Sequence, residues 1–365
     1  DAVSWFLAAG LVTCQEYRQL TLANTTKKVI QNAPKSRALS VSLKGCPDWG
    51  PKSYKAFEEE TGFILAKQAE RDSMIVASKL TKTYGEFVAV DGIDFEVKRG
   101  ESFGILGPNG AGKSTLMRTI AALQEADSGS IHLGDLDVIN NKMEVRRTLG
   151  YLPQEFGVYP KISAYDMLDH IAVLKGIRNG RKAMVEELLK RVNLWEVRKK
   201  ALGGFSGGMK QRFGIAQALI GDPQLIIVDE PTAGLDPGER NRFYNLLSEI
   251  GEQVIVILST HIVEDVKELC SQMAIIDQGR VLFAGSPSEA LSSIRNRIWS
   301  SSVPKQRLQE LSSQLPVIST RMVAGQPIIH VFGDRPPMEG FSQVEGDLED
   351  VFFSHIKGFN KAVEA

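Results

Sequence analysis

The sequence predicts an α/β protein built on a central, mostly parallel β-sheet. From Met74 to about Gly285, short apolar strands alternate with Gly-rich turns and helical patterns, which is typical of an α/β sheet. Several strands are continuous apolar runs of four or five residues, as expected for strands buried on both faces of a parallel sheet. These runs are Ser102–Leu106, Leu225–Val228, Val254–Leu258 and Met273–Ile276.

Helical patterns fill much of the remaining chain in this region. Lys113–Leu123 carries leucine and isoleucine at helical spacing directly after the first apolar strand. Between Pro160 and Ile220 the pattern is helical, and Ser163 with Asp166 predicts a capping box at its start. The sequence therefore predicts a helical insertion in an α/β core.

A small α/β domain is predicted from Ser286 to the end of the chain. Its Gly and Pro positions indicate turns between short elements. The expected elements are a helix at Pro287–Arg297, a strand near Trp299, a helix at Lys305–Leu315, strands at Pro316–Val323 and Ile328–Phe332 about a turn at Ala324–Pro327, and a helix from Asp347 to about Lys357. The chain thus divides into residues 1–73, 74–285 and 286–365.

Residues 1–73 carry no motif with recognisable chemistry. Ala2–Val12 is an apolar run of 11 residues, about half the roughly 20 that span a bilayer. It is either part of a signal or membrane segment or the start of a buried or partner-facing helix, and its shortness favours the second. Cys46–Pro51 reads as a loop and Tyr54–Ala69 as a helix.

Composition excludes several classes of protein. The 365 residues contain 43 basic and 44 acidic side chains, so no field of one sign favours nonspecific binding to nucleic acid. The cysteines are Cys14, Cys46 and Cys270, an odd number without CxxC spacing. They predict neither a disulfide framework nor a zinc site, and a reducing compartment fits best.

A glycine-rich loop lies directly between the first apolar strand and the helix that follows it. It reads GPNGAGKST and contains the spacing G-x-x-x-x-G-K-S. Glycines let successive amide groups surround a phosphate, and the helix N-terminus adds positive potential. In such loops the lysine reaches the β- and γ-phosphates and the serine hydroxyl binds Mg²⁺. The predicted nucleotide-binding residues are Gly107, Pro108, Asn109, Gly110, Ala111, Gly112, Lys113, Ser114 and Thr115.

Two carboxylates follow the apolar strand Leu225–Val228. Asp229 is placed to hold Mg²⁺ through water, and Glu230 is placed to accept a proton from water attacking the γ-phosphate. The loop alone does not separate kinases, GTPases and ATPases, whereas this acid pair favours an ATPase.

From about residue 76 to 285 the chain resembles the nucleotide-binding subunits of ABC (ATP-binding cassette) transporters, with the motifs in family order. The resemblance implies a P-loop NTPase cassette with an antiparallel β subdomain and a helical subdomain at about 155–220. Tyr84 in KTYGEF resembles the aromatic residue that stacks on adenine. Gln154 in GYLPQE resembles the glutamine that contacts Mg²⁺ and the attacking water, and the adjoining loop Glu155–Pro160 is where such subunits meet the membrane partner.

The sequence SGGMKQ, which begins at Ser206, resembles the signature sequence unique to this family. In the family this helix start meets the γ-phosphate held by the other subunit, so the resemblance assigns Ser206, Gly207 and Gly208 to a sandwiched ATP. Phe205 stands where leucine is usual, and Met209 stands where glutamine is commonest. Met209 removes one polar contact, but the backbone role does not depend on it.

Two further motifs resemble parts of the dimeric site. The segment AGLD, which ends at Asp236, resembles the loop that crosses the dimer interface. His261 in LSTHIVED matches the switch histidine that touches the γ-phosphate. LEDVFF at Leu348–Phe353 resembles the close of the C-terminal extension in ATPase subunits with separate permeases, often exporters.

The resemblance implies an ATPase subunit that dimerises around ATP and Mg²⁺, as a homodimer or heterodimer, and drives export through a separate transmembrane permease. Glu230 is expected to act as base and His261 as γ-phosphate contact, with Gln154 and Lys113 completing the catalytic set. Ser114, Gln154 and Asp229 are expected to hold Mg²⁺. Such a subunit lies at the cytoplasmic face of the cell membrane, bound through its permease.

Two alternatives belong to other classes. A soluble ABC ATPase acting on ribosomes or DNA would carry two cassettes, a long coiled coil or a basic footprint, and this chain has one cassette and a neutral charge balance. No nucleic acid partner is therefore expected. A nonhydrolysing binding subunit would lack Glu230 or His261, and both are present.

Overall fold

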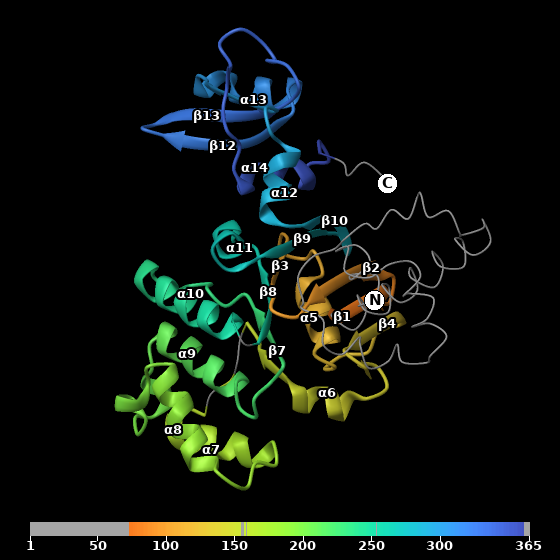
Figure 1. The fold of residues 1–365 in the computed structure, drawn as a ribbon. Coiled ribbons are helices and arrows are strands. Elements are labelled where there is room, and N and C mark those ends of the chain that lie inside the picture. The colour runs from red at the N-terminus through yellow and green to blue at the C-terminus, as the bar shows by residue number, and fades with distance from the viewer. Residues whose placement is uncertain (1–72, 155–156, 158, 253, 361–365) are drawn as a thin grey trace, which may run out of the picture. The chain divides into compact units, whose positions relative to one another are not determined.

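The computed structural model describes residues 73–365 apart from 155–156, 158, 253 and 361–365. Met74–Ala365 forms one compact unit (Figure 1). The predicted helix at Tyr54–Ala69 and the apolar run Ala2–Val12 lie outside the described residues. Within the described part, no helix is both long and apolar enough to span a membrane.

A six-stranded sheet forms the centre of the described unit, with the order β10-β9-β3-β8-β7-β6. Strands β9, β3, β8, β7 and β6 run parallel, and β10 pairs antiparallel with β9 at the edge. The predicted mostly parallel sheet is thus confirmed. The strands are β3 (Ser102–Leu106), β6 (Leu149–Leu152), β7 (Leu225–Asp229), β8 (Ile255–Thr260), β9 (Gln272–Asp277) and β10 (Arg280–Gly285).

The register of the central sheet brings three strand ends to one edge. Leu106 at the end of β3 lies opposite Thr260 at the end of β8. Asp229 at the end of β7 lies opposite Ser259 on β8. All residues of β7 and β8 are buried, which explains their continuous apolar sequence. The polar segments that follow these strands therefore start side by side, as expected at the carboxyl edge of a parallel sheet.

A second, antiparallel sheet has the order β2-β1-β4-β5. Helix α5 (Lys113–Ile120) lies between the two sheets, because its Leu116, Met117 and Ile120 are buried in one cluster with apolar residues of both. The sequence extended this helix to Leu123. It ends earlier because Ala122 adopts a left-handed conformation with φ of 55°. The strands are β1 (Ser73–Tyr84), β2 (Phe87–Lys98), β4 (Ser128–Leu133) and β5 (Leu136–Asp137).

Apart from β6, the region between β5 and β7 is helical. Ser163 caps α7, since its hydroxyl oxygen accepts from the Asp166 amide at 3.1 Å, which confirms the N-cap half of the predicted capping box. The Ser163 hydroxyl also donates to the Asp166 carboxylate at 2.6 Å. The elements are α6 (Lys142–Thr148), α7 (Ala164–Leu174), α8 (Arg181–Arg191), α9 (Gly207–Ala218) and the 3-10 turns η2 (Trp195–Val197) and η3 (Leu202–Gly204).

Two further helices cover the face of the central sheet opposite to α5. Helix α10 (Pro237–Gly251) buries Phe243, Leu247 and Ile250 in the cluster that also holds the apolar side chains of β7 and β8. Helix α11 (Val263–Leu269) follows β8 and packs against β3 and β8. Both helices start at the same sheet edge as the polar strand ends.

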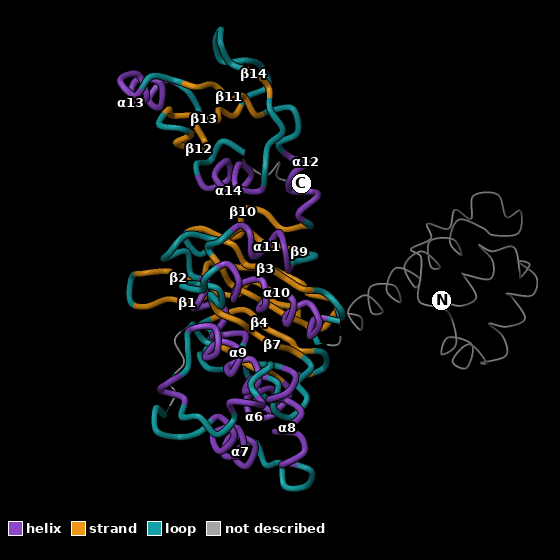
Figure 2. Tube along the Cα trace, turned by 90° about the vertical axis from the view of Figure 1, so that its left-hand side faces the viewer, coloured by secondary structure: helices purple, strands orange, loops and turns teal. Residues whose placement is uncertain are grey.

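The C-terminal segment forms an antiparallel sheet of order β12-β13-β11-β14 with three helices. It lies at the opposite end of the unit from α7 and α8 (Figure 1; Figure 2). The first helix stops at Ser293, short of the predicted Arg297, and Asn296 turns the chain with φ of 63°. The elements are α12 (Pro287–Ser293), β11 (Ile298–Ser302), α13 (Lys305–Gln314), β12 (Val317–Val323), β13 (Gln326–Phe332), β14 (Ser342–Gln343) and α14 (Leu348–Ile356).

Candidate active site

The glycine-rich loop leaves β3 at Gly107 and enters α5 at Lys113. The Gly107 amide donates to the Thr260 carbonyl at 3.2 Å, which ties the loop to the end of β8. Gly112 has φ of 99°, and a Cβ there would lie 2.1 Å from the Ala89 carbonyl oxygen. No other residue fits this position without moving backbone, so the glycine preceding the lysine is required by the local structure.

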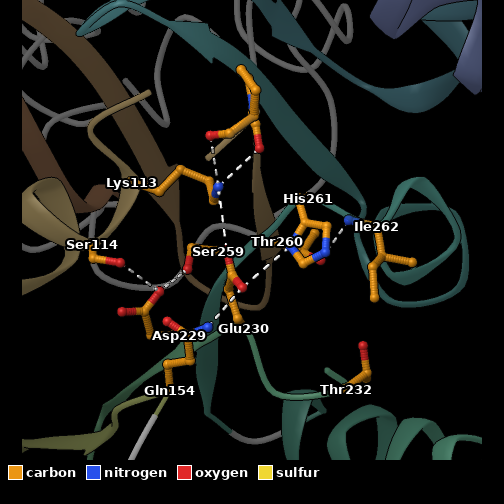
Figure 3. A network of polar contacts seen from close by, with 12 residues as sticks. Lys113, Ser114, Gln154, Asp229, Glu230, Thr232, Ser259, Thr260, His261 and Ile262 are labelled. Carbon is orange, nitrogen blue, oxygen red and sulfur yellow. Dashed lines mark hydrogen bonds and ion pairs between the residues drawn. The ribbon is translucent and has the colours of Figure 1, made fainter. Parts of the chain in front are cut away.

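Lys113 is held inside the loop that precedes it. Its Nζ donates to the carbonyl oxygens of Gly107 at 2.8 Å and Pro108 at 3.0 Å (Figure 3). The same Nζ lies 3.3 Å from Oε1 of Glu230. The lysine side chain is 4% exposed. This buried ammonium group is therefore fixed at the centre of the loop, beside the second acid of the pair.

Asp229 is buried and accepts two hydroxyl groups on one oxygen. Ser114 Oγ donates to its Oδ1 at 3.3 Å, and the Ser259 hydroxyl donates to the same atom. Ser114 belongs to the first turn of α5, and Ser259 lies directly opposite Asp229 in the sheet. The register of β7 and β8 thus places this carboxylate beside the glycine-rich loop.

Glu230 connects the loop to two other predicted residues. Its Oε2 accepts from Gln154 Nε2 at 3.0 Å and lies 3.2 Å from Nδ1 of His261 (Figure 3). Its backbone has φ of 46°, a conformation that costs a non-glycine residue about 1–2 kcal/mol and that is found at functional sites. The Glu230 amide donates to the Ser259 carbonyl at 2.9 Å, which helps to hold that turn.

The residues predicted to bind Mg²⁺ are chemically suited to it. Ser114 and Asp229 already converge, and Gln154 turns its amide nitrogen toward Glu230, which leaves its oxygen as the ligand atom. Mg²⁺ prefers oxygen ligands and is commonly held by one or two carboxylates together with substrate phosphates. Among the described residues, no group of three His, Cys, Asp or Glu side chains could hold a metal unaided. The donor set therefore fits an ion shared with a phosphate ligand.

Other predicted site residues lie outside this network. Tyr84 is half exposed, and its hydroxyl donates to Gln124 Oε1 at 2.7 Å. Ser206 is the N-cap of α9, with Gly207 and Gly208 as its first residues. Asp236 is the N-cap of α10 and accepts from the Glu239 amide at 2.9 Å. The structure does not join these residues to Lys113 and Glu230 within one chain.

The two departures from the signature pattern have clear packing roles. Phe205 is buried, and its ring meets that of Phe213 edge to face with centroids 6.5 Å apart. Met209 is partly buried against the apolar cluster of the helical region, and its amide donates to Ser206 Oγ at 3.3 Å. With both residues in place, Ser206 is the N-cap of α9.

The sequence analysis did not identify the second layer of polar residues. Ser259 and Thr260 both precede His261 and contact the acid pair or the loop, and Asp265 accepts from the hydroxyls of Thr232 and Thr260. Polar residues at the end of a fully buried strand were the available signal, because such side chains need partners. The position of Asp265 could not be found without knowing how α11 packs.

Comparisons with known proteins agree with the site. Residues 90–233 match a family model described as ABC transporter. The linearmycin resistance ATP-binding protein LnrL of Bacillus subtilis (strain 168) is 39% identical over 60% of this chain and 71% of that protein. The Nod factor export ATP-binding protein I of Paraburkholderia xenovorans (strain LB400) is 35% identical over 61% of this chain and 74% of that protein.

A solved structure shows the same cassette. The dimeric post-hydrolysis structure of the ATP-binding cassette MJ0796 bound to ADP and Pi is similar with a TM-score of 0.54 and 27% identity, covering 58% of this chain and 98% of that one. LnrL and the Nod factor export protein are matched over more than two thirds of their own length, and the solved cassette has a similar fold. Together these similarities establish the family. The chain therefore belongs to the ABC transporter ATP-binding proteins and is an ATPase of the P-loop cassette type.

Proposed function

We propose that this chain is the ATP-hydrolysing subunit of an ABC exporter and works as a dimer that drives a separate membrane permease. The observation that carries the proposal is the convergence of Lys113, Asp229, Glu230 and His261 at one edge of the sheet. Export is supported by relatives named for linearmycin resistance and Nod factor export. In this arrangement the subunit sits at the cytoplasmic face of the cell membrane.

Each residue of the network has a role in transfer of the γ-phosphoryl group to water. Lys113 binds the β- and γ-phosphates from within the loop, and His261 contacts the γ-phosphate. Glu230 accepts the proton of the attacking water as the new P–O bond forms and the bond to ADP breaks. Its Oε1 lies 3.3 Å from Lys113 Nζ, so bound phosphate would share that ammonium group with the carboxylate.

Mg²⁺ is assigned to Ser114, Asp229 and Gln154. When bound, the ion would neutralise phosphate charge and help to align the nucleotide. The hydrogen bond from Ser114 Oγ to Asp229, at 3.3 Å, supports this set because the two oxygens already lie next to each other. The amide oxygen of Gln154 would bind the ion, while its amide nitrogen donates a hydrogen bond to Glu230.

The predicted residues outside the network are assigned either to the nucleotide held by the facing subunit or to the adenine ring. Ser206, Gly207 and Gly208 form the start of a 12-residue helix, where backbone amides and the helix dipole attract a phosphate. Asp236 supports the neighbouring site across the dimer interface. Tyr84 is half exposed, and its ring is assigned to stack on adenine.

The permease is proposed to dock between the central sheet and the helical region. A cleft of about 190 Å³ opens there beside Leu123, Arg146, Tyr151 and Lys175. Leu123 is 52% exposed, so an apolar contact is offered at the rim. The predicted contact loop Glu155–Pro160 falls partly outside the described residues.

Copurification from detergent-solubilised membranes tests the proposal. The tagged full chain is expected to bring down a polytopic membrane protein in stoichiometric amount, identified by mass spectrometry. A matched Leu123→Arg variant should lose this protein and keep its ATP hydrolysis. Recovery of ribosomal proteins or nucleic acid instead would contradict the exporter assignment.

A further inference from the structure

A buried carboxylate outside the assigned site connects several of its segments. Asp265 lies in the first turn of α11 and is fully buried. Its carboxylate accepts from Thr232 Oγ1 at 2.8 Å on both oxygens, from Thr260 Oγ1 at 2.6 Å and from the Tyr244 hydroxyl at 2.7 Å. Burying a carboxylate is costly unless it is well hydrogen-bonded, and these three hydroxyl groups meet that need.

Two of these partners belong to the segments that carry the proposed catalytic groups. Thr232 lies two residues after Glu230 and begins the loop that ends at Asp236. Thr260 directly precedes His261, and its hydroxyl oxygen also accepts from the Ile262 amide at 2.9 Å (Figure 3). The Asp265 carboxylate therefore connects the segment that follows Glu230 to the turn that carries His261.

The third partner extends this connection to a helix. Tyr244 lies on α10, whose N-cap is the predicted interface residue Asp236. Burial, and then the hydrogen bond to Asp265, raise the pKa of the Tyr244 hydroxyl, so it stays a donor. On the other side, the Thr260 carbonyl accepts from the Gly107 amide at 3.2 Å. The histidine turn and α10 thus meet at Asp265, and the glycine-rich loop is joined to the same turn through Thr260.

We infer that Asp265 is a positioning residue for hydrolysis, which fixes His261 and the 232–236 loop relative to Glu230. This inference rests on the proposed function of the same site. The hydroxyls of Thr260 and Thr232 both donate to Asp265, so loss of this common acceptor removes one hydrogen bond from each of the two segments. A displacement of about 1 Å in a catalytic group can cost about 10²-fold in rate.

An aspartate suits this position better than an amide. All three partners donate to it, and a carboxylate has only acceptors. In Asp265→Asn one oxygen becomes an NH₂ group, so at least one hydroxyl must turn away from its present direction. Asp265→Asn therefore keeps the shape of the side chain and breaks its hydrogen-bond pattern.

The test measures kcat, KM and the Kd for Mg-ATP of the full chain, together with its Tm. Asp265→Asn is expected to lower kcat by about 10- to 100-fold and to change Kd by less than about threefold. Asp350→Asn is the control, because Asp350 is also a fully buried carboxylate, held in the C-terminal domain by Ser319 Oγ at 3.3 Å and by His330 Nδ1 at 2.9 Å. It is expected to keep kcat near the wild-type value.

The threonines give a second test that does not need a change at Asp265. Thr260→Val and Thr232→Val remove the hydroxyl and keep the shape, whereas Thr260→Ser and Thr232→Ser keep the hydroxyl. Each valine variant is expected to lose about tenfold in kcat while each serine variant stays within about twofold, since the loss follows the hydrogen bond. Combining Thr260→Val with Asp265→Asn should add little further loss, because both changes break one network.

Glu230→Gln, measured in parallel, separates this inference from the proposed function. Wild-type kcat in Asp265→Asn, with Glu230→Gln inactive, overturns the positioning role alone. Equal kcat in the valine and serine variants, or a Kd that weakens as much as kcat falls, also overturns it. Wild-type kcat in Glu230→Gln overturns the assignment of the base whatever Asp265 does.

Discussion

Replacing Glu230 by glutamine removes one negative charge from a buried group and keeps its size. In the structure Oε1 lies 3.3 Å from Lys113 Nζ, which corresponds to a gross attraction of about 5 kcal/mol at an effective dielectric constant of about 20. Lys113 keeps its hydrogen bonds to the Gly107 and Pro108 carbonyls. The net loss in unfolding free energy is therefore expected to be smaller, about 3 kcal/mol, at the lower end for breaking a buried ion pair.

Glu230→Gln is expected to lower turnover without weakening the binding of Mg-ATP. A general base contributes about 10² to 10⁴ in rate, so turnover of Glu230→Gln is expected to fall by that factor. Mg-ATP affinity should stay the same or rise, because phosphate no longer competes with the Glu230 carboxylate for Lys113. Phosphate release measures the first effect, and titration calorimetry measures the second.

The thermal stability of Glu230→Gln should depend on bound nucleotide, because phosphate also interacts with Lys113. The Tm of Glu230→Gln is expected to lie below that of the wild type without ATP and to recover with Mg-ATP, when phosphates supply the missing negative charge. Glu230→Asp is the matched control, since it keeps the carboxylate and shortens the side chain by one methylene. Turnover of Glu230→Gln within a few-fold of wild type would refute the assignment of the base.

Three further predictions address the loop, the facing subunit and the C-terminal domain. Gly112→Ala places a Cβ 2.1 Å from the Ala89 carbonyl, so Mg-ATP affinity should fall by at least about tenfold, roughly 1.4 kcal/mol, and an unchanged Kd by calorimetry would contradict the loop geometry. In the Glu230→Gln background, Ser206→Arg should abolish the ATP-dependent dimer in size-exclusion chromatography while monomer ATP binding persists; a dimer that survives would argue against the head-to-tail arrangement. Deleting residues 286–365 should leave measurable phosphate release, because that segment carries no phosphate loop or acid pair; complete loss in a folded, ATP-binding truncation would place part of the active site there.

The fold of the central sheet could be predicted because its strands are buried on both faces. Such strands show as continuous apolar runs, and β3 has the predicted bounds Ser102–Leu106. The helix ends were predicted less well. Ala122 ends α5 in a left-handed conformation that nothing in its residue type indicates, and the Asn296 turn follows the early end of α12. Helix ends depend on local contacts that a periodic pattern does not contain.

The nucleotide loop and the acid pair were predictable because each combines residue types and spacing with a strand end. The structure brings Lys113, Asp229, Glu230 and His261 together as the sheet register requires. The polar layer around Asp265 was not predictable. Its members are far apart in the sequence, and each alone is an ordinary hydroxyl or acid whose burial depends on how α10 and α11 pack.

The most direct test of the account is the structure of Glu230→Gln with Mg-ATP. The account predicts a dimer in which the γ-phosphate lies between Lys113 and His261 of one subunit and the Ser206 helix start of the other. Mg²⁺ should contact Ser114 in the same site. A monomer with ATP bound elsewhere, or a dimer whose Ser206 faces away from the nucleotide, would contradict it.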